Sequence, residues 1–392
     1  MKKLIISLSL LAAVWPATAQ NGYDAVLRQI EANSIALIAL REQIDAQKLT
    51  NRTGIYPTNP EVEASYLWGA PHGIGNRVDL SVRQSFDFPA AYGYRNQIAG
   101  LQNANAERFY QSERIKILLS VQQTCVNLIY YNALDKLYAQ RLQNAETLAA
   151  AYQARLEKGD ANRLEYNKAQ WNLTAVQTEK TRIEAEQTAL LLELRQMNGG
   201  RAIVLTDTVY PVQSLPDDFA DWYAGVETRH PALQYAGGQI EIGRQQVKLN
   251  RALGLPGFSA GYMSEKVAGE QFQGITLGIS IPLWENKNRV KQAKAQVRAA
   301  ESALNDNKKQ VFNHLQNLYL KAAARRENAQ KLRASLSENN NEPLLKKALD
   351  SGEISLLSYL TEIEYYYDAF NKMLEAERDY EQARAELSAI EL

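Results

Sequence analysis

The sequence predicts an exported α+β membrane protein that combines long antiparallel coiled-coil helices with four strands and has an internal two-fold repeat. Three observations lead to this fold class. The 392-residue chain begins with an export signal, its two halves carry the same landmarks in register, and its helical stretches are too long for one globular core. Four strands are too few to close a wall alone, so we expect three copies of the chain to share one twelve-stranded β-barrel.

The composition excludes several functional classes. The 44 basic and 44 acidic side chains sum to a formal charge of zero, and a nucleic-acid partner would require a net basic surface. The single cysteine, Cys125, rules out an internal disulfide framework and a multi-cysteine metal site. The sequence contains neither a Gly-x-Ser-x-Gly nucleophile motif nor a His-Glu-x-x-His metal motif. We therefore expect no enzyme, no cofactor and no metal site.

Residues 1–19 have the parts of a secretory signal peptide. Two lysines precede an apolar run from Leu4 to Trp15, and Ala-Thr-Ala at residues 17–19 provides a small-x-small cleavage site. The run is shorter than the roughly 20 residues that a membrane-spanning helix needs. No later stretch is long and apolar enough for such a helix, so any part that spans a membrane must consist of barrel strands.

Residues 20–200 and residues 219–392 follow one plan and are joined by a linker at residues 201–218. Pro89 and Gly159 are 70 positions apart, and so are Pro282 and Gly352. The residues after each glycine also match at a constant offset of 193, as the pairs Leu164 and Leu357, and Tyr166 and Tyr359. We infer a duplication. Each half contains a helix, two strands, a very long helix, a turn and another long helix.

The helices are predicted from apolar periodicity and from the absence of breaking residues. Each half begins with a shorter helix, at residues 23–48 and 219–251. The long helices are predicted at residues 89–156, 161–197, 283–349 and 353–390. The first of these would be about 100 Å long at 1.5 Å per residue, so it needs neighbours along its whole length. Apolar residues spaced 4, 3, 4, 3, 4 over residues 138–156 and 356–374 indicate a coiled-coil seam, although an ordinary helical bundle shows the same spacing.

Prolines and glycines mark the ends of these helices. Pro89 and Pro282 mark the two transitions from strand to helix, because proline suits the first turn of a helix. Gly159 and Gly352 can adopt the left-handed conformation that ends a helix before the chain reverses. Pro343 follows three asparagines inside the predicted third long helix. It predicts either a kinked hinge or a new helix with Pro343 in its first turn.

Four strands are predicted at residues 61–69, 76–88, 257–267 and 271–282. Apolar residues such as Val78 and Val82 alternate with polar residues such as Asp79 and Ser81. Two hairpins of a soluble sheet would alternate in the same way, but an exported chain with such long helices favours a transmembrane barrel. The candidate residues of its aromatic belt are Tyr66, Trp68, Tyr262 and Trp284.

The order and spacing of these landmarks resemble the TolC family of outer membrane efflux proteins over nearly the whole mature chain. In the second half the matching segments are Arg-His-Pro-Ala-Leu at 229–233, Ile-Ser-Ile-Pro-Leu at 279–283 and Ser-Gly-Glu-Ile-Ser-Leu-Leu at 351–357. Their first-half equivalents are residues 33–34, 86–89 and 158–160. Within the family, residues 59–61 and 81–86 most resemble the branch that works with heavy-metal resistance pumps.

The resemblance implies a homotrimer with a twelve-stranded barrel in the outer membrane of a Gram-negative-type bacterium and a helical barrel in the periplasm. It further implies a passive exit duct of a tripartite efflux system, which contacts outer membrane lipid and docks with a periplasmic adaptor and an inner-membrane pump. An exported coiled-coil protein with a structural or adhesive role and no barrel is the alternative function. Membrane fractionation separates the two.

The resemblance also assigns roles to the two turns. It places the adaptor-docking tips of the duct at Lys158, Gly159, Asp160, Ser351, Gly352 and Glu353. In well-known members, aspartates just beyond the second turn form a constricting acidic ring, but Ser358 and Thr361 stand at the matching positions here. Glu362 lies close to them, and Glu165 occupies the equivalent place after the first turn. These four residues are the candidate entrance constriction, although a solvated helix face would carry the same glutamates.

Overall fold

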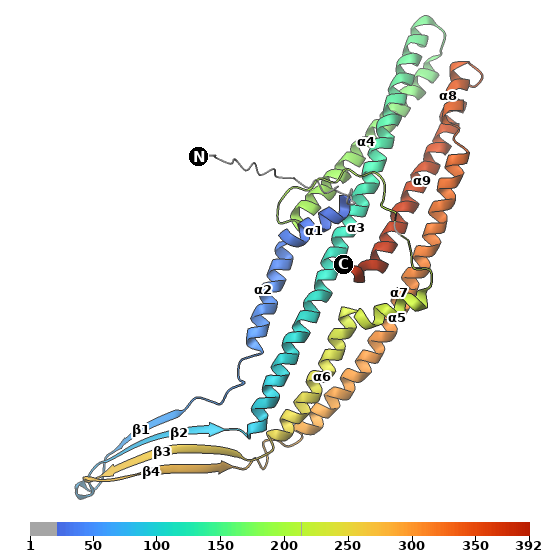
Figure 1. Cartoon of the computed structure of the whole chain (residues 1–392). Coiled ribbons are helices and arrows are strands. Elements are labelled where there is room, and N and C mark those ends of the chain that lie inside the picture. Colours follow the sequence, from blue (N-terminus) through green and yellow to red (C-terminus); the bar gives the residue numbers. More distant parts are fainter. Residues whose placement is uncertain (1–21, 213) are drawn as a thin grey trace, which may run out of the picture. The chain divides into compact units, whose positions relative to one another are not determined.

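The computed structural model describes residues 22–212 and 214–392, and the predicted signal peptide lies outside these residues. The described chain is mostly helical with one four-stranded antiparallel sheet (Figure 1). The helices and strands are α1 (Gly22–Asn33), α2 (Ile35–Thr50), β1 (Glu61–Leu67), η1 (His72–Ile74), β2 (Arg77–Phe86), α3 (Pro89–Lys158), α4 (Arg163–Met197), α5 (Phe219–Arg229), α6 (Pro231–Ala252), β3 (Gly257–Val267), β4 (Glu270–Ser280), α7 (Arg289–Glu338), α8 (Glu342–Asp350), α9 (Leu356–Ser388) and η2 (Ala389–Glu391). Within the described chain, no helix is both long and apolar enough to cross a lipid bilayer.

The chain divides into two compact units. Within the described residues, unit 1 contains residues 22–35, 120–212, 214 and 325–382, which include α1, α4, α8 and most of α9. Unit 2 contains residues 36–119, 215–324 and 383–392, which include the whole sheet with α2, α5 and α6. The long helices α3 and α7 contribute to both units. The order of elements up to the sheet, two helices followed by two strands, occurs twice along the chain.

Two helices that the sequence predicted as continuous are each broken in two. The helix expected at 219–251 breaks at His230, because Pro231 disfavours a helical conformation in the residue before it and supplies no backbone N–H. The helix expected at 23–48 breaks at Ser34. There the side-chain amide of Asn33 donates a hydrogen bond of 3.0 Å to Oδ1 of the buried Asn198. This second break depends on a contact with a residue far along the chain.

The start and end of α7 also differ from the prediction of one helix at 283–349. The helix begins at Arg289, because Asn288 has a left-handed φ of 66° that a right-handed helix cannot include. Pro282 therefore lies in the loop before α7, whereas Pro89 is the first residue of α3. At the other end, residues 339–341 separate α7 from α8, and Pro343 lies in the first turn of α8. Pro343 thus starts a new helix.

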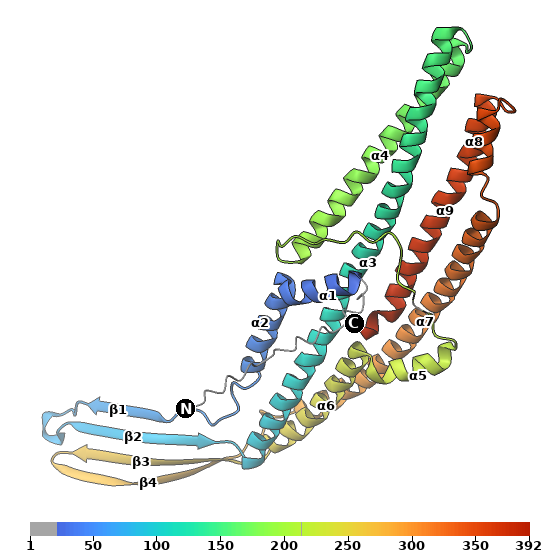
Figure 2. The ribbon, with the colours of Figure 1, turned by 45° about the horizontal axis from the view of Figure 1, so that its top comes forward.

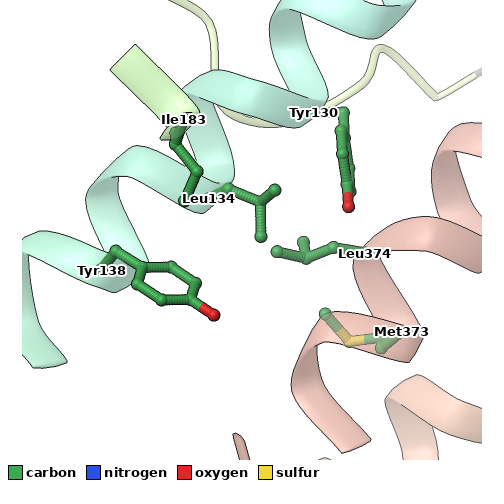
Figure 3. Packing of buried hydrophobic residues seen from close by; sticks show 6 residues of the cluster. All are labelled: Tyr130, Leu134, Tyr138, Ile183, Met373 and Leu374. Carbon is green, nitrogen blue, oxygen red and sulfur yellow. The ribbon is translucent and has the colours of Figure 1, made fainter. Parts of the chain in front are cut away.

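The predicted seams lie inside the helical packing. All residues of the two predicted heptad series, at 138–156 and 356–374, are buried or half-buried. In unit 1 the core joins α3, α4 and α9 through the six side chains shown in Figure 3, which are Tyr130, Leu134, Tyr138, Ile183, Met373 and Leu374. Each aliphatic side chain buried there contributes about 1.5–3 kcal/mol relative to an exposed one.

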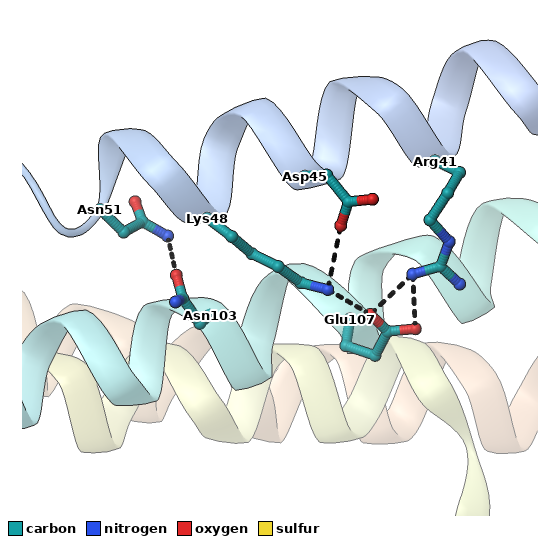
Figure 4. Close-up of polar contacts among 6 residues, drawn as sticks. All are labelled: Arg41, Asp45, Lys48, Asn51, Asn103 and Glu107. Carbon is teal, nitrogen blue, oxygen red and sulfur yellow. Dashed lines mark hydrogen bonds and ion pairs between the residues drawn. The ribbon is translucent and has the colours of Figure 1, made fainter.

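Unit 2 is held by aromatic packing and by ion pairs between helices. Phe219 and Tyr223 of α5 pack against Phe312 of α7, with ring centroids 5.5 and 4.9 Å from that of Phe312. Glu107 of α3 forms ion pairs of 2.9 Å with both Arg41 and Lys48 of α2 (Figure 4). Half-exposed pairs of this kind contribute little individually, but they fix the register of α2 on α3.

The strands form one antiparallel sheet in the order β1-β2-β3-β4, which Figure 2 shows from a second direction. The central pairing joins the two halves of the chain, with Val82 opposite Tyr262. Because β1 and β4 each have a strand neighbour on one side, the sheet has two unpaired edges. No helix of unit 2 covers either face of the sheet (Figures 1 and 2).

Candidate functional site

The two turns predicted as tips have the same backbone geometry. Gly159 has φ +80° and Gly352 has φ +78°, a conformation that other residues adopt only with strain. At the first turn the N–H of Asp160 donates to the carbonyl of Arg155 at 2.8 Å, and at the second the N–H of Glu353 donates to that of Ala348 at 2.9 Å. This bond from the sixth residue to the first is the Schellman motif. Both turns therefore end their helices in one defined way.

The side chains of these turns are free to contact a partner. All six predicted tip residues are exposed. Among them Lys158, Asp160 and Glu353 carry charge, and a Cβ added at either glycine would meet no atom within 4 Å. The structure thus presents two open turns of matching shape and mixed charge.

The helices that follow the turns begin with side-chain caps. Oδ1 of Asn162 accepts a hydrogen bond of 2.9 Å from the N–H of Glu165, whose carboxylate accepts one of 3.0 Å from the N–H of Asn162. This reciprocal capping box stabilises the start of α4. At the second turn Oγ of Ser355 accepts a hydrogen bond of 3.1 Å from the N–H of Ser358, which explains why α9 begins at Leu356 and not at residue 353.

The caps account for two of the four residues proposed as an entrance constriction. Glu165 holds the start of α4, and the hydroxyl of Ser358 lies 3.0 Å from that of Ser355. Thr361 donates to the carbonyl of Leu357 in its own helix at 2.9 Å. Glu362 remains exposed, beside a cavity of about 440 Å³ between α7, α8 and α9. The helix caps thus give Glu165 and Ser358 a local structural role.

A small apolar core lies behind the turns and fixes α9 on the first hairpin. Leu356 is 1% exposed and packs with Ala149 and Tyr152 of α3 and Ala169 of α4. Burial raises the pKa of Tyr152 and of Tyr359, so both phenols stay protonated at physiological pH. The start of α9 is therefore anchored by packing.

The register of the sheet gives it one apolar face, because directly paired residues point to the same side. The apolar side chains of this face are Val62, Ala64, Tyr66, Val78, Leu80, Val82, Phe86, Phe258, Ala260, Tyr262, Ile275, Leu277 and Ile279. All of them except Ala64 and Ala260 are large hydrophobic side chains exposed by 37% or more. Gln84 interrupts this surface, and Ser264, Lys266, Gln271 and Gln273 border it toward the β3–β4 turn. An exposed apolar surface of this size marks a binding or lipid-facing site.

The opposite face of the sheet is mostly polar. It carries Glu61, Glu63, Ser65, Arg77, Asp79, Ser81, Arg83, Ser85, Ser259, Glu265, Glu270, Thr276 and Ser280, interrupted by Leu67, Met263, Val267 and Phe272. Arg77 forms ion pairs of 2.8 Å with Asp79 and 3.2 Å with Glu265. Acidic residues outnumber basic ones on this face.

The four candidate aromatic residues do not all lie where the sequence placed them. Tyr66 and Trp68 lie at the end of β1, with ring centroids 5.6 Å apart, and Trp284 lies beyond the end of β4. Tyr262 is instead in the middle of β3, opposite Val82 and Ile275, and its hydroxyl lies 2.7 Å from Oε1 of Gln273. The predicted strand at 257–267 has the same bounds as β3, so its centre already excludes Tyr262 from a belt at the strand ends.

A polar cluster in unit 1 was missed by the sequence reasoning. Arg141 of α3 is buried and contacts Tyr367 and Asn371 of α9. The signal was a charged residue next to the predicted seam residue Leu142, and sequence alone gave it no partner. No group of three or more histidine, cysteine, aspartate and glutamate side chains that could hold a metal ion occurs in the part of the chain that the structure describes.

Comparisons with known proteins agree with this architecture. The sequence model of the outer membrane efflux protein family matches residues 222–390. No curated protein sequence matches the chain significantly. A membrane protein from Pseudomonas aeruginosa matches with a TM-score of 0.77 and 17% identity, over 95% of this chain and 90% of that protein.

Two solved outer membrane channels are also similar. The Campylobacter jejuni channel CmeC matches with a TM-score of 0.75 and 16% identity, over 94% of this chain and 85% of its own. The open-state Neisseria gonorrhoeae channel MtrE matches with a TM-score of 0.77 and 14% identity, over 94% of this chain and 88% of its own. At such identities these structures show that the fold is shared, and the family model over residues 222–390 supports the resemblance of the chain to the TolC family of outer membrane efflux proteins.

Proposed function

We propose that the chain is one subunit of a homotrimeric outer membrane duct through which a tripartite efflux system releases its cargo. The observation that carries the proposal is the four-stranded sheet, with one exposed apolar face, one polar face and two unpaired edges. Lipid cannot satisfy the hydrogen bonds of an open sheet edge, and the smallest membrane barrels have about eight strands. Three copies supply twelve strands and leave no edge.

The position of the apolar residues supports strands that are tilted in a membrane. In β1 the apolar residues Val62, Ala64 and Tyr66 pair with positions 78–82 of β2. In β4 they begin with Ile275, on the same row as Val82, and continue in the opposite direction along the sheet through Ile279. The apolar band thus crosses the strands obliquely. An oblique band is expected where strands are tilted by about 35–45° from a barrel axis that is perpendicular to the bilayer.

The polar face of the sheet would line the lumen, and the helices would extend the duct into the periplasm after removal of residues 1–19. Within this arrangement the turns at Gly159 and Gly352 dock a periplasmic adaptor, which connects the duct to an inner-membrane pump. The matching geometry and full exposure of the two turns support this role. The duct makes and breaks no bonds, and the pump provides the transport energy and the choice of cargo.

The excess of acidic residues on the polar face favours the passage of cations. Together with the resemblance of residues 59–61 and 81–86 to the branch that works with heavy-metal pumps, this excess supports a metal-cation cargo. The ratio of cation to anion permeability in a planar bilayer tests the lumen charge. A ratio at or below one would remove this support for a cation duct.

Membrane fractionation tests the duct against an exported coiled-coil protein without a barrel. The duct must be found in outer membranes after washing with urea or carbonate and must require detergent for release. Recovery in the soluble periplasmic fraction, or release by the wash alone, would favour the coiled-coil protein with a structural or adhesive role.

A further inference from the structure

A buried arginine joins α3 to α9 inside unit 1. Arg141 is 5% exposed. Its Nη2 donates hydrogen bonds of 2.9 Å to the backbone carbonyl of Tyr367 and of 3.2 Å to Oδ1 of Asn371. A helix carbonyl of this kind is already an acceptor within its own helix, so the guanidinium adds a second donor to it. The arginine therefore connects two helices that are more than 200 positions apart in the sequence.

Two aromatic rings, one from each helix, contact the guanidinium. Its central carbon lies 4.4 Å from the ring centroid of Tyr138 and 3.9 Å from that of Tyr367. Cation–π contacts are stronger for a desolvated guanidinium group than for an exposed one. Asn371 also donates to the hydroxyl of Tyr138 at 3.4 Å. The cluster is therefore built from both helices.

The same cluster reaches the first residue of α8. A carboxylate oxygen of Glu342 accepts hydrogen bonds of 3.3 Å from the amide of Asn144 and 3.2 Å from the hydroxyl of Tyr367. We name the complete group the Arg141 latch. Its members are Tyr138, Arg141, Asn144, Glu342, Tyr367 and Asn371. Through Tyr367 the latch links α3, α8 and α9.

The latch has an energetic cost that makes it releasable. Among the residues that the structure describes, no carboxylate forms an ion pair with Arg141, and its acidic neighbours Glu364 and Asp368 act on it only through longer-range attraction. Burial lowers the pKa of Arg141, and its Nε is buried without a hydrogen-bond partner. The free energy lost by removing such a charge from water is regained when water reaches it again. A cavity of about 280 Å³, lined by Arg141, Asn144, Tyr359, Glu364 and other residues, lies beside the guanidinium and leaves room for rearrangement.

The segment beyond the latch has few anchors of its own. In α8 no residue is buried, and the helix lies between the break at 339–341 and the turn at Gly352. Leu344 of α8 is 66% exposed. The core around Leu356 anchors the start of α9. In the described chain, the side-chain hydrogen bond between α8 and α3 is that of Glu342 with Asn144, which belongs to the latch. Release of the latch would therefore free α8 first.

We propose that Arg141 is a positioning residue which, through Tyr367 and Glu342, holds α8 and the second tip against α3, and that the second tip moves when this latch opens. The role of that movement in opening the entrance of a duct rests on the proposed function. The mechanical link itself does not, because it is a property of each chain.

Hydrogen exchange of the purified full-length protein, followed by mass spectrometry, tests the link. Arg141→Met keeps the length and apolar volume of the side chain but removes its charge and its donors. We expect amide exchange to accelerate about tenfold across residues 342–371, as for the loss of a charge-assisted hydrogen bond. Tyr367→Phe keeps the stacked ring and loses the contacts of the hydroxyl with Glu342 and Asn144. Within residues 342–371, acceleration should therefore be confined to residues 342–350.

Arg155→Met is the matched control. Arg155 is on the same helix and lies over the ring of a tyrosine three positions before it, as Arg141 does. It is exposed, however, and it contacts Tyr152 of its own helix. Exchange in residues 342–371 must stay at the wild-type rate in this variant. Wild-type exchange there in both Arg141→Met and Tyr367→Phe would overturn the latch. An equal acceleration throughout α4 in Arg141→Met would also count against it, because that indicates general loss of stability.

A conductance measurement then separates the latch from the proposed function. In a planar bilayer, Arg141→Met should spend a several-fold larger fraction of time in the open state than the wild type and Arg155→Met. Equal open fractions in conducting wild type and Arg141→Met would refute a role at the entrance. A wild-type protein that does not conduct would refute the duct, while the exchange experiment still decides whether the latch exists.

Discussion

The assignment of the apolar face to lipid makes a sharp prediction for two adjacent residues of β4. Leu277 lies on the apolar face, 83% exposed and opposite Ala260, whereas Thr276 lies on the polar face opposite Gly261. Leu277→Arg places a charge in lipid, and Thr276→Arg places the same charge in the lumen. The two substitutions are one residue apart on the same strand, and each faces a small residue of β3. Any difference between them therefore reports which face is in the membrane.

The magnitude follows from the place of Leu277 in the apolar band. The apolar residues of β4 continue from Ile275 past the strand end to Leu283, so the middle of the band is near Ile279. Leu277 lies two residues from this point, or about 7 Å along the strand. An arginine near the bilayer midplane costs about 2–4 kcal/mol, which lowers the folding equilibrium constant about 30- to 700-fold.

Folding into lipid vesicles from urea, followed by resistance to protease, measures this cost. We expect Leu277→Arg to fold with the stated loss and Thr276→Arg to fold within a few tenths of a kcal/mol of the wild type. The reasoning is refuted if Leu277→Arg inserts normally. It is also refuted if Thr276→Arg is the more damaging of the two, because the polar face would then be the one in lipid.

Three further predictions concern the turns and unit 2. Gly352→Ala should destabilise the second tip by about 1–2 kcal/mol. The cause is the φ of +78° alone, because an added Cβ meets no atom within 4 Å. Hydrogen exchange at residues 348–355 should become faster, and an unchanged rate would contradict the Schellman geometry. Asp160→Lys and Glu353→Lys should each reduce co-purification of the adaptor while the detergent-extracted oligomer stays intact; unaltered co-purification in both would mean that the turns do not dock it. Arg41 and Lys48 lower the pKa of Glu107, so its ion pairs stabilise unit 2 fully above the ordinary pKa of 4.5 and lose this contribution as the pH falls below that value. Because the pairs are half-exposed, Glu107→Gln should lower the free energy of unfolding by about 0.5 kcal/mol or less in urea titrations at pH 7, and it should have no effect at pH 3. An equal loss at both pH values would show that charge is not the cause.

The features that sequence analysis predicted are those that depend on local chemistry. Alternation gave the four strands, heptad spacing gave the buried seams, and Gly159 and Gly352 gave the two turns, because each signal is complete within a short segment. The break at His230 has an equally local cause, because Pro231 disfavours a helical residue before it.

The features that were missed depend on contacts between distant residues. The break at Ser34 is stabilised by Asn198, and the partners of Arg141 lie on α9. The sequence identified Glu165 as a charged residue near a tip, but its bond to the backbone of Asn162 makes it a helix cap. A spacing in the sequence places a side chain on a face of a helix, and only packing decides which group it meets.

The central claim is that each chain supplies one third of a closed wall. The most direct test combines native mass measurement of the detergent-extracted protein with conductance in a planar lipid bilayer. The account predicts a particle containing three chains that forms discrete, stable pores. A particle containing one chain that produces no pores would contradict it.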